Sequence, residues 1–340
     1  MNYKTRKLVI TLSIICILLF AFLTLTIILA LSSCKSAAET SIAVSETEAT
    51  AETIQETEPE ITEAPTEEVK IISRETELPL EVKTSDLQWT CSNCQVENAM
   101  GSNQCYKVWV PNIDGPKDVL VMMHVSKNPL DNTGFPSDWV DHTYYFDGKS
   151  STPWEIGDAL AAIAEKKPFI LVSPNYISWV DKDVPHDIAN QDFLIPECQL
   201  KFLKDICSKF ETYAQPTEES ILENREHFLL GGASIGGNWT SLGLIRGLSR
   251  YYGNFFIGSD STRYQTPLEN LAEGLKRVAE PTLVWCIDGT MEGDHTRVTW
   301  NYLKDLSFDF AEVRHITILE GHHLYSTWLT ALNYIMTNAF

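Results

Sequence analysis

The stretch that most constrains this chain is a serine flanked by glycines, between a short apolar run and an amphipathic segment. Residues 227–237 read HFLLGGASIGG, and the apolar side chains that follow recur at three-residue steps, as in a helix. Gly232, Ser234 and Gly236 fit the G-x-S-x-G pattern of a nucleophile elbow, a sharp turn between a strand and a helix. Such a turn presents the serine hydroxyl at a helix N-terminus, beside backbone N–H groups that can bind an oxyanion. The pattern predicts a nucleophilic serine at position 234, with a tightly packed glycine-rich turn as the alternative.

Strand-like apolar runs alternate with helical patterns from about residue 105 to the end of the chain. Strands are expected at 105–111, 118–124 and 168–173, in the run before Ser234, and at 255–258, 282–287 and 313–319. Helices are expected from Pro153, at 192–210, after Ser234, and at 268–278, 297–306 and 325–337. This alternation predicts an α/β fold with a mostly parallel sheet covered by helices on both faces. In such folds ligands bind beyond the carboxyl ends of the strands, where Ser234 is expected.

A serine hydroxyl is a weak nucleophile and needs a histidine base that is itself oriented by a carboxylate. In folds of this kind the chain order is serine, acid, histidine. His322 and His323 come directly after the expected strand 313–319, and His295 is a third candidate nearer the serine. The base is therefore expected among these three histidines.

The acid is expected in the loop after the preceding strand, residues 282–287. Asp288, Glu292 and Asp294 all lie in or next to this loop, whose sequence from residue 288 reads DGTMEGD. Spacing alone leaves the choice among these three carboxylates open.

At these motifs the chain resembles the putative-esterase branch of the α/β-hydrolases, which includes feruloyl, acetyl-xylan and enterochelin esterases. The resemblance runs over most of residues 105–340. Residues 232–237, GASIGG, resemble the family's G-x-S-x-G-G, and residues 321–328, GHHLYSTW, align with its G-G-H-D-W-x-x-W without a gap. This register implies that His323 is the base and leaves His322 where a glycine is usual.

The same resemblance bears on the acid. Residues 289–292, GTME, resemble the family's G-T-x-D, which implies Glu292 as the acid. Asp294 fits instead if the loop carries a two-residue insertion. Because aspartate is the usual acid, we favour Asp294 and keep Glu292 as the alternative.

The oxyanion hole departs from the family pattern. The family has His-Gly-Gly after its second strand, whereas this chain has His124, Val125 and Ser126. We expect the donors to be the backbone N–H groups of Ile235 and of Val125, with Ser126 as the alternative to Val125. Losing one such donor costs about two to three powers of ten in rate. The missing glycines therefore favour a second hypothesis, an inactive hydrolase fold that binds carbohydrate or cell-wall material.

The resemblance implies a serine carboxylic-ester hydrolase that acts through an acyl-enzyme, on acylated carbohydrate or a small ester. A third hypothesis is an acyltransferase, in which an alcohol replaces water as the acceptor. No complete metal-binding pattern and no nucleotide-binding pattern is present, so no cofactor is implied. Several aromatic side chains can stack on a sugar or a phenolic acid, or can pack within their own loop. They are Trp139, His142, Tyr144, Tyr145 and Trp154.

The N-terminus reads as an export signal. Basic residues at 4, 6 and 7 precede an uncharged apolar run over 8–31, and Ser32 and Ser33 then precede Cys34. These features are typical of a secretory signal, and the cysteine resembles that of a bacterial lipobox. We expect residues 1–33 to be a lipoprotein signal peptide and Cys34 to be lipidated, with an uncleaved membrane-spanning anchor as the alternative. Either way the remainder is expected on the extracellular side of the cell membrane.

Residues 34–84 are expected to form a disordered tether, with the esterase-like domain over 85–340. The segment is rich in Glu, Thr, Ala and Ser and lacks aromatic residues, so it cannot bury enough apolar surface to offset the entropy of ordering. The whole chain carries a formal net charge of −20, about half of it in this segment. Such an acidic chain is not expected to bind nucleic acid.

The cysteines near residue 100 allow two interpretations. Residues 89–94, WTCSNC, together with Cys105 resemble a small zinc finger, but Val108 stands where a fourth ligand would complete a tetrahedral site. In an exported protein we expect a disulfide between two of Cys91, Cys94 and Cys105 instead of zinc. The remaining cysteines of the domain are expected to be buried as small apolar side chains; they are Cys198, Cys207 and Cys286.

Overall fold

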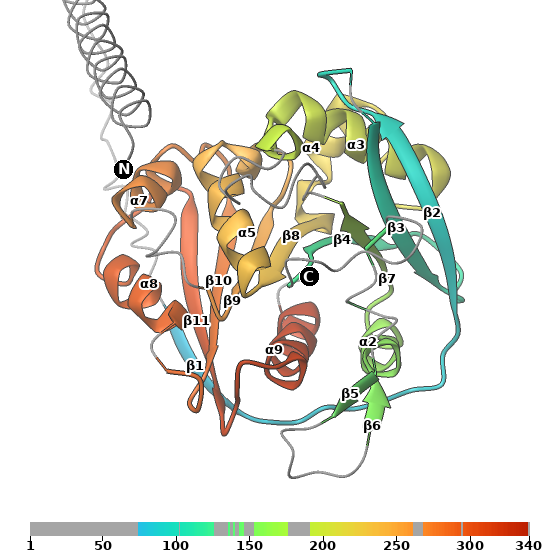
Figure 1. The fold of residues 1–340 in the computed structure, drawn as a ribbon. Coiled ribbons are helices and arrows are strands. Elements are labelled where there is room, and N and C mark those ends of the chain that lie inside the picture. The colour runs from blue at the N-terminus through green and yellow to red at the C-terminus, as the bar shows by residue number, and fades with distance from the viewer. Residues whose placement is uncertain are drawn as a thin grey trace, which may run out of the picture. The chain divides into compact units, whose positions relative to one another are not determined.

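The computed structural model describes residues 74–338, except residues 102, 126–134, 137–138, 140–142, 146–152, 176–190, 261–267 and 294. All of them belong to one compact unit, Glu67–Phe340. Its centre is a nine-stranded sheet in the order β1-β11-β10-β9-β8-β4-β7-β3-β2 (Figure 1). The strands are β1 (Arg74–Pro79), β2 (Trp89–Glu97), β3 (Asn103–Pro111), β4 (Asp118–Met123), β7 (Phe169–Pro174), β8 (Phe228–Ala233), β9 (Asn254–Gly258), β10 (Thr282–Gly289) and β11 (Ala311–Leu319).

The first seven strands in this sheet order, β1-β11-β10-β9-β8-β4-β7, are all parallel to their neighbours. The last two differ, because β3 runs antiparallel to both β7 and β2. A separate hairpin joins β5 (Thr143–Tyr145) to β6 (Pro153–Glu155). The helices are α2 (Ile156–Ala164), α3 (Pro196–Lys209), α4 (Glu218–Glu223), α5 (Ile235–Ile245), α7 (Leu268–Lys276), α8 (His295–Leu303) and α9 (Tyr325–Asn338). Short 3₁₀ turns lie at η1 (Gln191–Leu194), η2 (Arg225–His227) and η3 (Leu248–Arg250). The predicted α/β fold with a mostly parallel sheet is confirmed.

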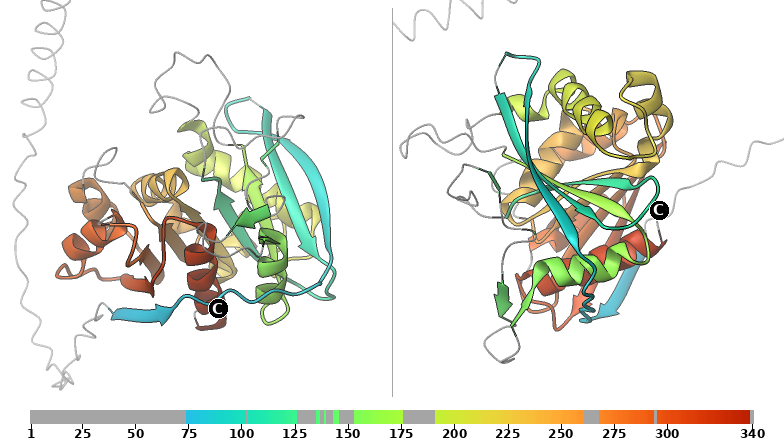
Figure 2. Two further views of the ribbon diagram at one scale, coloured as in Figure 1. Left: turned by 60° about the horizontal axis from the view of Figure 1, so that its bottom comes forward. Right: turned by 90° about the vertical axis from the view of Figure 1, so that its right-hand side faces the viewer.

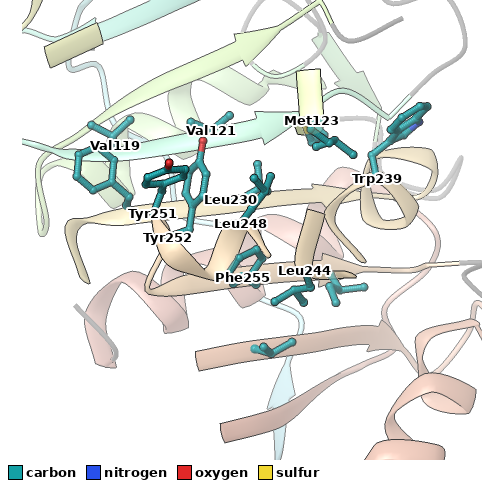
Figure 3. Close-up of a cluster of buried hydrophobic side chains, with 14 of the residues drawn as sticks. Val119, Val121, Met123, Leu230, Trp239, Leu244, Leu248, Tyr251, Tyr252 and Phe255 are labelled. Carbon is teal, nitrogen blue, oxygen red and sulfur yellow. The ribbon is translucent and has the colours of Figure 1, made fainter. Parts of the chain in front are cut away.

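Both faces of the sheet are buried, which explains why its central strands are continuous apolar runs. Along β4, Val119 and Val121 join one core cluster while Leu120 joins the other, because successive side chains of a strand point to opposite faces. Figure 3 shows part of the first cluster, in which side chains of β4, β8 and β9 meet Trp239 and Leu244 of α5. Residues of α3, α4, α5, α7 and α8 contribute to this cluster, and residues of α2 and α9 to the other. In Figure 2 α2 and α9 lie side by side on their face of the sheet.

The N-terminal boundary of the domain differs from the expectation. Residues 74–79, which we placed in the disordered tether, form the edge strand β1, in parallel register with Arg314–Leu319 of β11. From β1 the chain crosses the α9 and α2 side to β2 at the opposite edge of the sheet (Figure 1). On the way Glu81 hydrogen-bonds Thr330 of α9, and the Ser85 N–H donates to the Asp158 carbonyl of α2. The expected boundary at residue 85 is therefore too late.

Two proline positions also shift element bounds. Pro153, expected to open a helix, lies in β6, and α2 begins at Ile156. The helix expected over 192–210 is divided into η1 and α3, with Pro196 as the first residue of α3. Proline lacks an N–H and clashes with the preceding helical turn, so it is tolerated in the first turn of a helix and not in its interior.

The disulfide expected among Cys91, Cys94 and Cys105 is wrong, and the pairing of β2 with β3 gives the reason. Cys105 lies opposite Gln95, so Cys94 points to the other face of the ribbon, and it also points away from Cys91. Cys91 shares the face of Cys105 but lies about 13 Å further along the strand, well beyond the Cα separation that a disulfide spans. Burial raises the pKa of the Cys94 and Cys105 thiols.

The expectation for the other three cysteines is confirmed, since Cys198, Cys207 and Cys286 are all buried. None of the helices between residues 74 and 338 that the structure describes is long and apolar enough to cross a bilayer. The expected signal peptide, Cys34 and most of the expected tether lie outside the described residues.

Candidate active site

Ser234 occupies a strained turn between β8 and α5. Its backbone has φ 55° and ψ −121°, a conformation that residues other than glycine rarely adopt. The neighbouring glycines explain the turn: a Cβ on Gly232 would lie 2.5 Å from the Gly236 carbonyl carbon, and one on Gly236 would lie 2.5 Å from the Met123 carbonyl oxygen. The Ser234 N–H donates to the Gly258 carbonyl at 2.8 Å, which ties the turn to β9. This is the sharp strand-to-helix turn that the sequence predicts.

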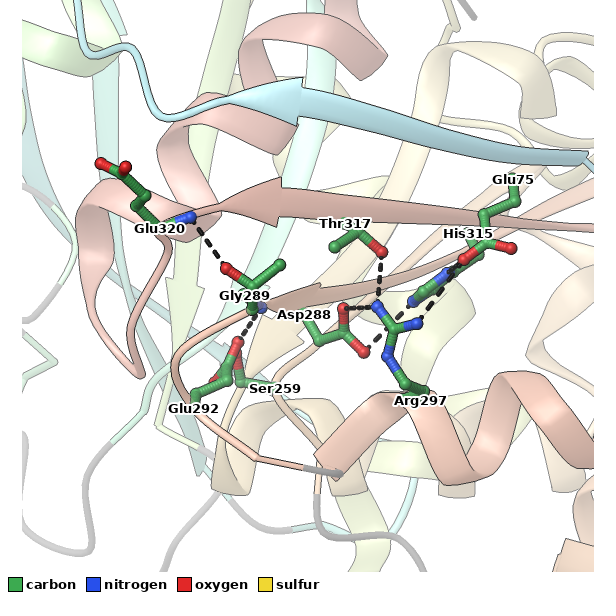
Figure 4. Close-up of polar contacts among 10 residues, drawn as sticks. Glu75, Ser259, Asp288, Gly289, Glu292, Arg297, His315, Thr317 and Glu320 are labelled. Atoms are coloured by element: carbon green, nitrogen blue, oxygen red, sulfur yellow. Dashed lines mark hydrogen bonds and ion pairs between the residues drawn. The ribbon is translucent and has the colours of Figure 1, made fainter.

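Glu292, in the loop after β10, contacts the imidazole of His323. Its carboxylate is buried, and its Oε2 lies 3.0 Å from His323 Nδ1. Its other oxygen accepts hydrogen bonds from the Ser259 hydroxyl, at 2.8 Å, and from the Gly289 N–H (Figure 4). Both carboxylate oxygens thus have hydrogen-bond partners, and Oε2 is the one that faces the imidazole.

The other two candidate acids are Asp294 and Asp288. Asp294, which we favoured from the sequence, lies outside the described residues. Asp288 is buried within β10, and its carboxylate faces Arg297 and His315 (Figure 4). Within the described residues, the candidate acid that meets His323 is thus Glu292.

The loop that carries Glu292 is hydrogen-bonded to the loop that carries His323. The Thr290 N–H donates to the Ile318 carbonyl at 3.0 Å, and the Met291 N–H donates to the Gly321 carbonyl at 2.8 Å. A Cβ on Gly289 would lie 2.2 Å from the Gly321 carbonyl oxygen, so the two backbones approach as closely as only glycine allows. The glycine of the family-like G-T motif therefore has a packing role between the two loops.

The histidines are also distinguished by position. His323 has an exposed side chain, with 41% of it accessible, and the Trp328 ring lies edge-on to it with centroids 5.4 Å apart. His322 is half-buried, and its carbonyl accepts a hydrogen bond from the Thr327 hydroxyl at 2.6 Å. His295 is the first residue of α8, and its side chain is not among those described. His323 is thus the histidine that meets the carboxylate, in the register that the resemblance implies.

The predicted site residues share one edge of the sheet. Ser234, Glu292 and His323 follow β8, β10 and β11, and Ser259 follows β9. These four strands are parallel neighbours in the sheet, so their carboxyl ends meet at the same edge. Hydrogen bonds link the elbow to the end of β9, Ser259 to Glu292, and Glu292 to His323. Sequence reasoning missed Ser259, because no motif surrounds it.

The expected oxyanion donors flank the elbow. Ile235 is the first residue of α5, directly after Ser234, and Val125 follows the end of β4. The close approach of Gly236 to the carbonyls of Met123 and His124 brings the start of α5 against this end of β4. Ser126, the alternative donor, lies outside the described residues.

Trp139 does not offer a stacking surface to a ligand. It is fully buried, its indole N–H donates to the Met123 carbonyl at 3.2 Å, and its ring packs edge-on against Tyr325. His142 and the side chains of Tyr144, Tyr145 and Trp154 lie outside what the structure describes. Over the same described portion, no group of three or more His, Cys, Asp or Glu side chains is arranged to hold a metal ion.

Comparison with known proteins identifies the fold. No family model and no curated protein matches the chain. Among solved structures it is similar to a serine-to-alanine mutant of the feruloyl esterase module from Clostridium thermocellum, complexed with sinapinate. That match has 17% identity and a TM-score of 0.54, and covers 79% of this chain and 93% of the other. A structure called FAE is similar at 16% identity and a TM-score of 0.53, covering 78% and 93%. The sheet and its helices are those of the α/β-hydrolase fold.

Proposed function

We propose that this protein is a serine esterase that cleaves carboxylic esters through an acyl-enzyme. The observation that carries the proposal is the contact between the buried Glu292 carboxylate and His323, at the same sheet edge as the strained Ser234. A nucleophile, an orienting acid and a base, in this chain order, form the catalytic triad of such folds. Glu292 takes the acid role because its carboxylate reaches His323.

In the proposed mechanism His323 Nε2 removes the proton from the Ser234 hydroxyl while the oxygen attacks the ester carbonyl carbon. Glu292 accepts a hydrogen bond from Nδ1–H, which selects the tautomer with a basic Nε2 and stabilises the imidazolium. The N–H groups of Ile235 and Val125 bind the oxyanion of the tetrahedral intermediate. The intermediate collapses as the imidazolium returns the proton to the leaving alcohol. A water molecule, activated by the same imidazole, then releases the acid.

The proposed substrate is an acylated saccharide or a small ester at the cell surface, reached by a protein that is lipid-anchored through Cys34. The resemblance of the motifs to feruloyl and acetyl-xylan esterases supports the substrate class. The exposed side chain of His323 is consistent with a site open to a large substrate. The lipobox-like sequence before Cys34 supports the location.

Hydrolysis of p-nitrophenyl acetate by the wild type and by Ser234→Ala, His323→Ala and His322→Ala tests this function. We expect the first two substitutions to lower kcat by about three powers of ten or more, with little change in the melting temperature. His322→Ala is the matched control and should stay within about threefold of wild type, since the imidazole that meets Glu292 is that of His323. Full activity in both the Ser234 and His323 variants would reject the assignment. A panel of acetyl, feruloyl and longer acyl esters then identifies the acyl group.

A second candidate function follows from Val125, which stands where the family has glycine. If the Val125 side chain distorts the geometry of the oxyanion hole so that catalysis is lost, the protein is an inactive hydrolase fold that binds carbohydrate. The wild type would then bind acylated polysaccharide without turnover, and Ser234→Ala would bind equally well.

The third hypothesis, an acyltransferase, has its own test. Product analysis with and without a sugar acceptor separates hydrolysis from acyl transfer.

A further inference from the structure

Ser259 shares with Ser234 a backbone conformation that is unfavourable for its residue type. Three non-glycine residues of the described part have a positive φ: Ser234 at 55°, Ser259 at 44° and Glu320 at 59°. Each directly follows one of the parallel strands at the candidate site. Such strain is unfavourable and persists where the surrounding structure imposes it, often at functional sites. Glycine would adopt this conformation at no steric cost, so the serine side chain at 259 requires an explanation.

The hydrogen bonds of Ser259 have a defined direction. The hydroxyl is buried, and Trp328 Nε1 lies 2.5 Å from it. An indole nitrogen only donates, so the Ser259 oxygen is the acceptor in that bond. The single hydroxyl proton is then available for Glu292 Oε1, at 2.8 Å. The direction therefore runs from Trp328 through Ser259 to the carboxylate.

This arrangement fixes a side chain that would otherwise be mobile. Glutamate has one more rotatable bond than aspartate, so its carboxylate loses more conformational freedom when it is held against an imidazole. The Ser259 hydroxyl and the Gly289 N–H both bind Oε1, which leaves Oε2 directed at His323 Nδ1. Trp328 also packs edge-on against the His323 ring. The Trp328 indole thus packs against His323 directly and holds Glu292 through the Ser259 hydroxyl.

We infer that Ser259, held by Trp328, is a positioning residue that directs the Glu292 carboxylate at His323. The inference rests on the proposed function, because it assigns a role within the same triad. Ser259 acts through Glu292, to which its hydroxyl donates.

The test replaces Ser259 by glycine in the full-length protein. Ser259→Gly removes the hydroxyl and relieves the positive φ, but it also leaves the buried Trp328 N–H without its acceptor, so the two effects on the melting temperature oppose each other and we expect a small net change. With p-nitrophenyl acetate we expect kcat to fall about 10–100-fold at unchanged KM, because a small misplacement of a catalytic group is costly. Glu320→Gly is the matched control, since it relieves a similar φ at an exposed side chain. It should gain stability without loss of kcat.

A double-mutant cycle shows whether Ser259 acts through Glu292. Ser259→Gly should lower kcat by less than about twofold further in a Glu292→Gln background. If the full 10–100-fold loss recurs there, or if the single variant retains wild-type kcat, the inference is overturned.

A spectroscopic measurement separates this inference from the proposed function. The imidazole Nδ1 proton that His323 shares with Glu292 should give a downfield proton NMR signal, absent from His323→Ala. Ser259→Gly should shift or broaden this signal, and the pKa of His323 measured by NMR titration should change with it. The same spectral response in a protein without esterase activity would sustain the positioning role and reject the proposed function. An unaltered signal and pKa would overturn the positioning role even in an active esterase.

Discussion

At the scale of the residue, the candidate site depends on which carboxylate meets the imidazole. Glu292 reaches His323 Nδ1 at 3.0 Å with both of its oxygens hydrogen-bonded, although we favoured Asp294 because aspartate is the commoner acid. Spacing in the sequence could not separate two carboxylates that are two residues apart in one loop. The choice depends on where the loop turns, and the close contact of Gly289 with Gly321 holds this loop against the one that carries His323.

Substitution of each carboxylate by its amide distinguishes the two acids. Glu292→Gln keeps the side-chain volume but removes the charge that selects the imidazole tautomer, so we expect kcat to fall by about three to four powers of ten. Asp294→Asn is the matched control and should change kcat by less than about threefold. Steady-state kinetics with p-nitrophenyl acetate provide the measurement. The reverse pattern would assign the acid to Asp294.

At the scale of the element, β1 is held to the sheet by a partly buried polar network. Glu75 of β1 lies 3.1 Å from His315 Nδ1 and 3.8 Å from Arg297 (Figure 4). His315 is completely buried, lies 3.2 Å from Asp288 on its other side, and stacks on Trp300. The sequence RETELP resembles the Glu/Thr-rich segment before it, and only the partner strand β11 makes it a strand. This is why composition alone extended the tether to residue 84.

Removing one contact of this network should destabilise the domain. Glu75→Ala leaves the buried His315 without one of its carboxylate partners, and we expect a loss of about 1–3 kcal/mol in the free energy of unfolding. Glu77→Ala is the matched control on the same exposed face of β1, and should stay within about 0.5 kcal/mol of wild type. Urea unfolding followed by circular dichroism measures both values. Equal effects of the two substitutions would exclude a specific role for Glu75.

At the scale of the whole molecule, the chain combines a domain of the α/β-hydrolase fold with an N-terminal region for which we propose a role in export. The described part of the domain begins at Arg74 with β1, which is an edge strand of the sheet. The site lies at the carboxyl ends of the parallel strands, as this fold class predicts. The proposed attachment to the membrane through Cys34 is independent of the fold and is tested separately.

Substitution of the lipidation cysteine tests this attachment. If Cys34 is lipidated, Cys34→Ser should move the protein from the membrane fraction to the soluble or secreted fraction, because the acyl chains supply the membrane affinity. Fractionation followed by immunoblotting measures the distribution, and the esterase activity per molecule should stay at the wild-type level. A variant that stays wholly in the membrane fraction would favour the alternative of an uncleaved spanning segment.

The sequence by itself determined the alternation of strands and helices, the elbow at Ser234 and the sheet edge on which His323 would lie. Each of these is written in a local pattern: a hydrophobic period, a glycine spacing, or a residue placed just after a strand. Tertiary structure alone decided the pairing of β1 with β11, the register that separates Cys94 from Cys105, and the contacts of Glu292 with Ser259 and His323. These features join segments far apart in the chain, and their free energy depends on packing and hydrogen bonds that no short stretch of sequence contains.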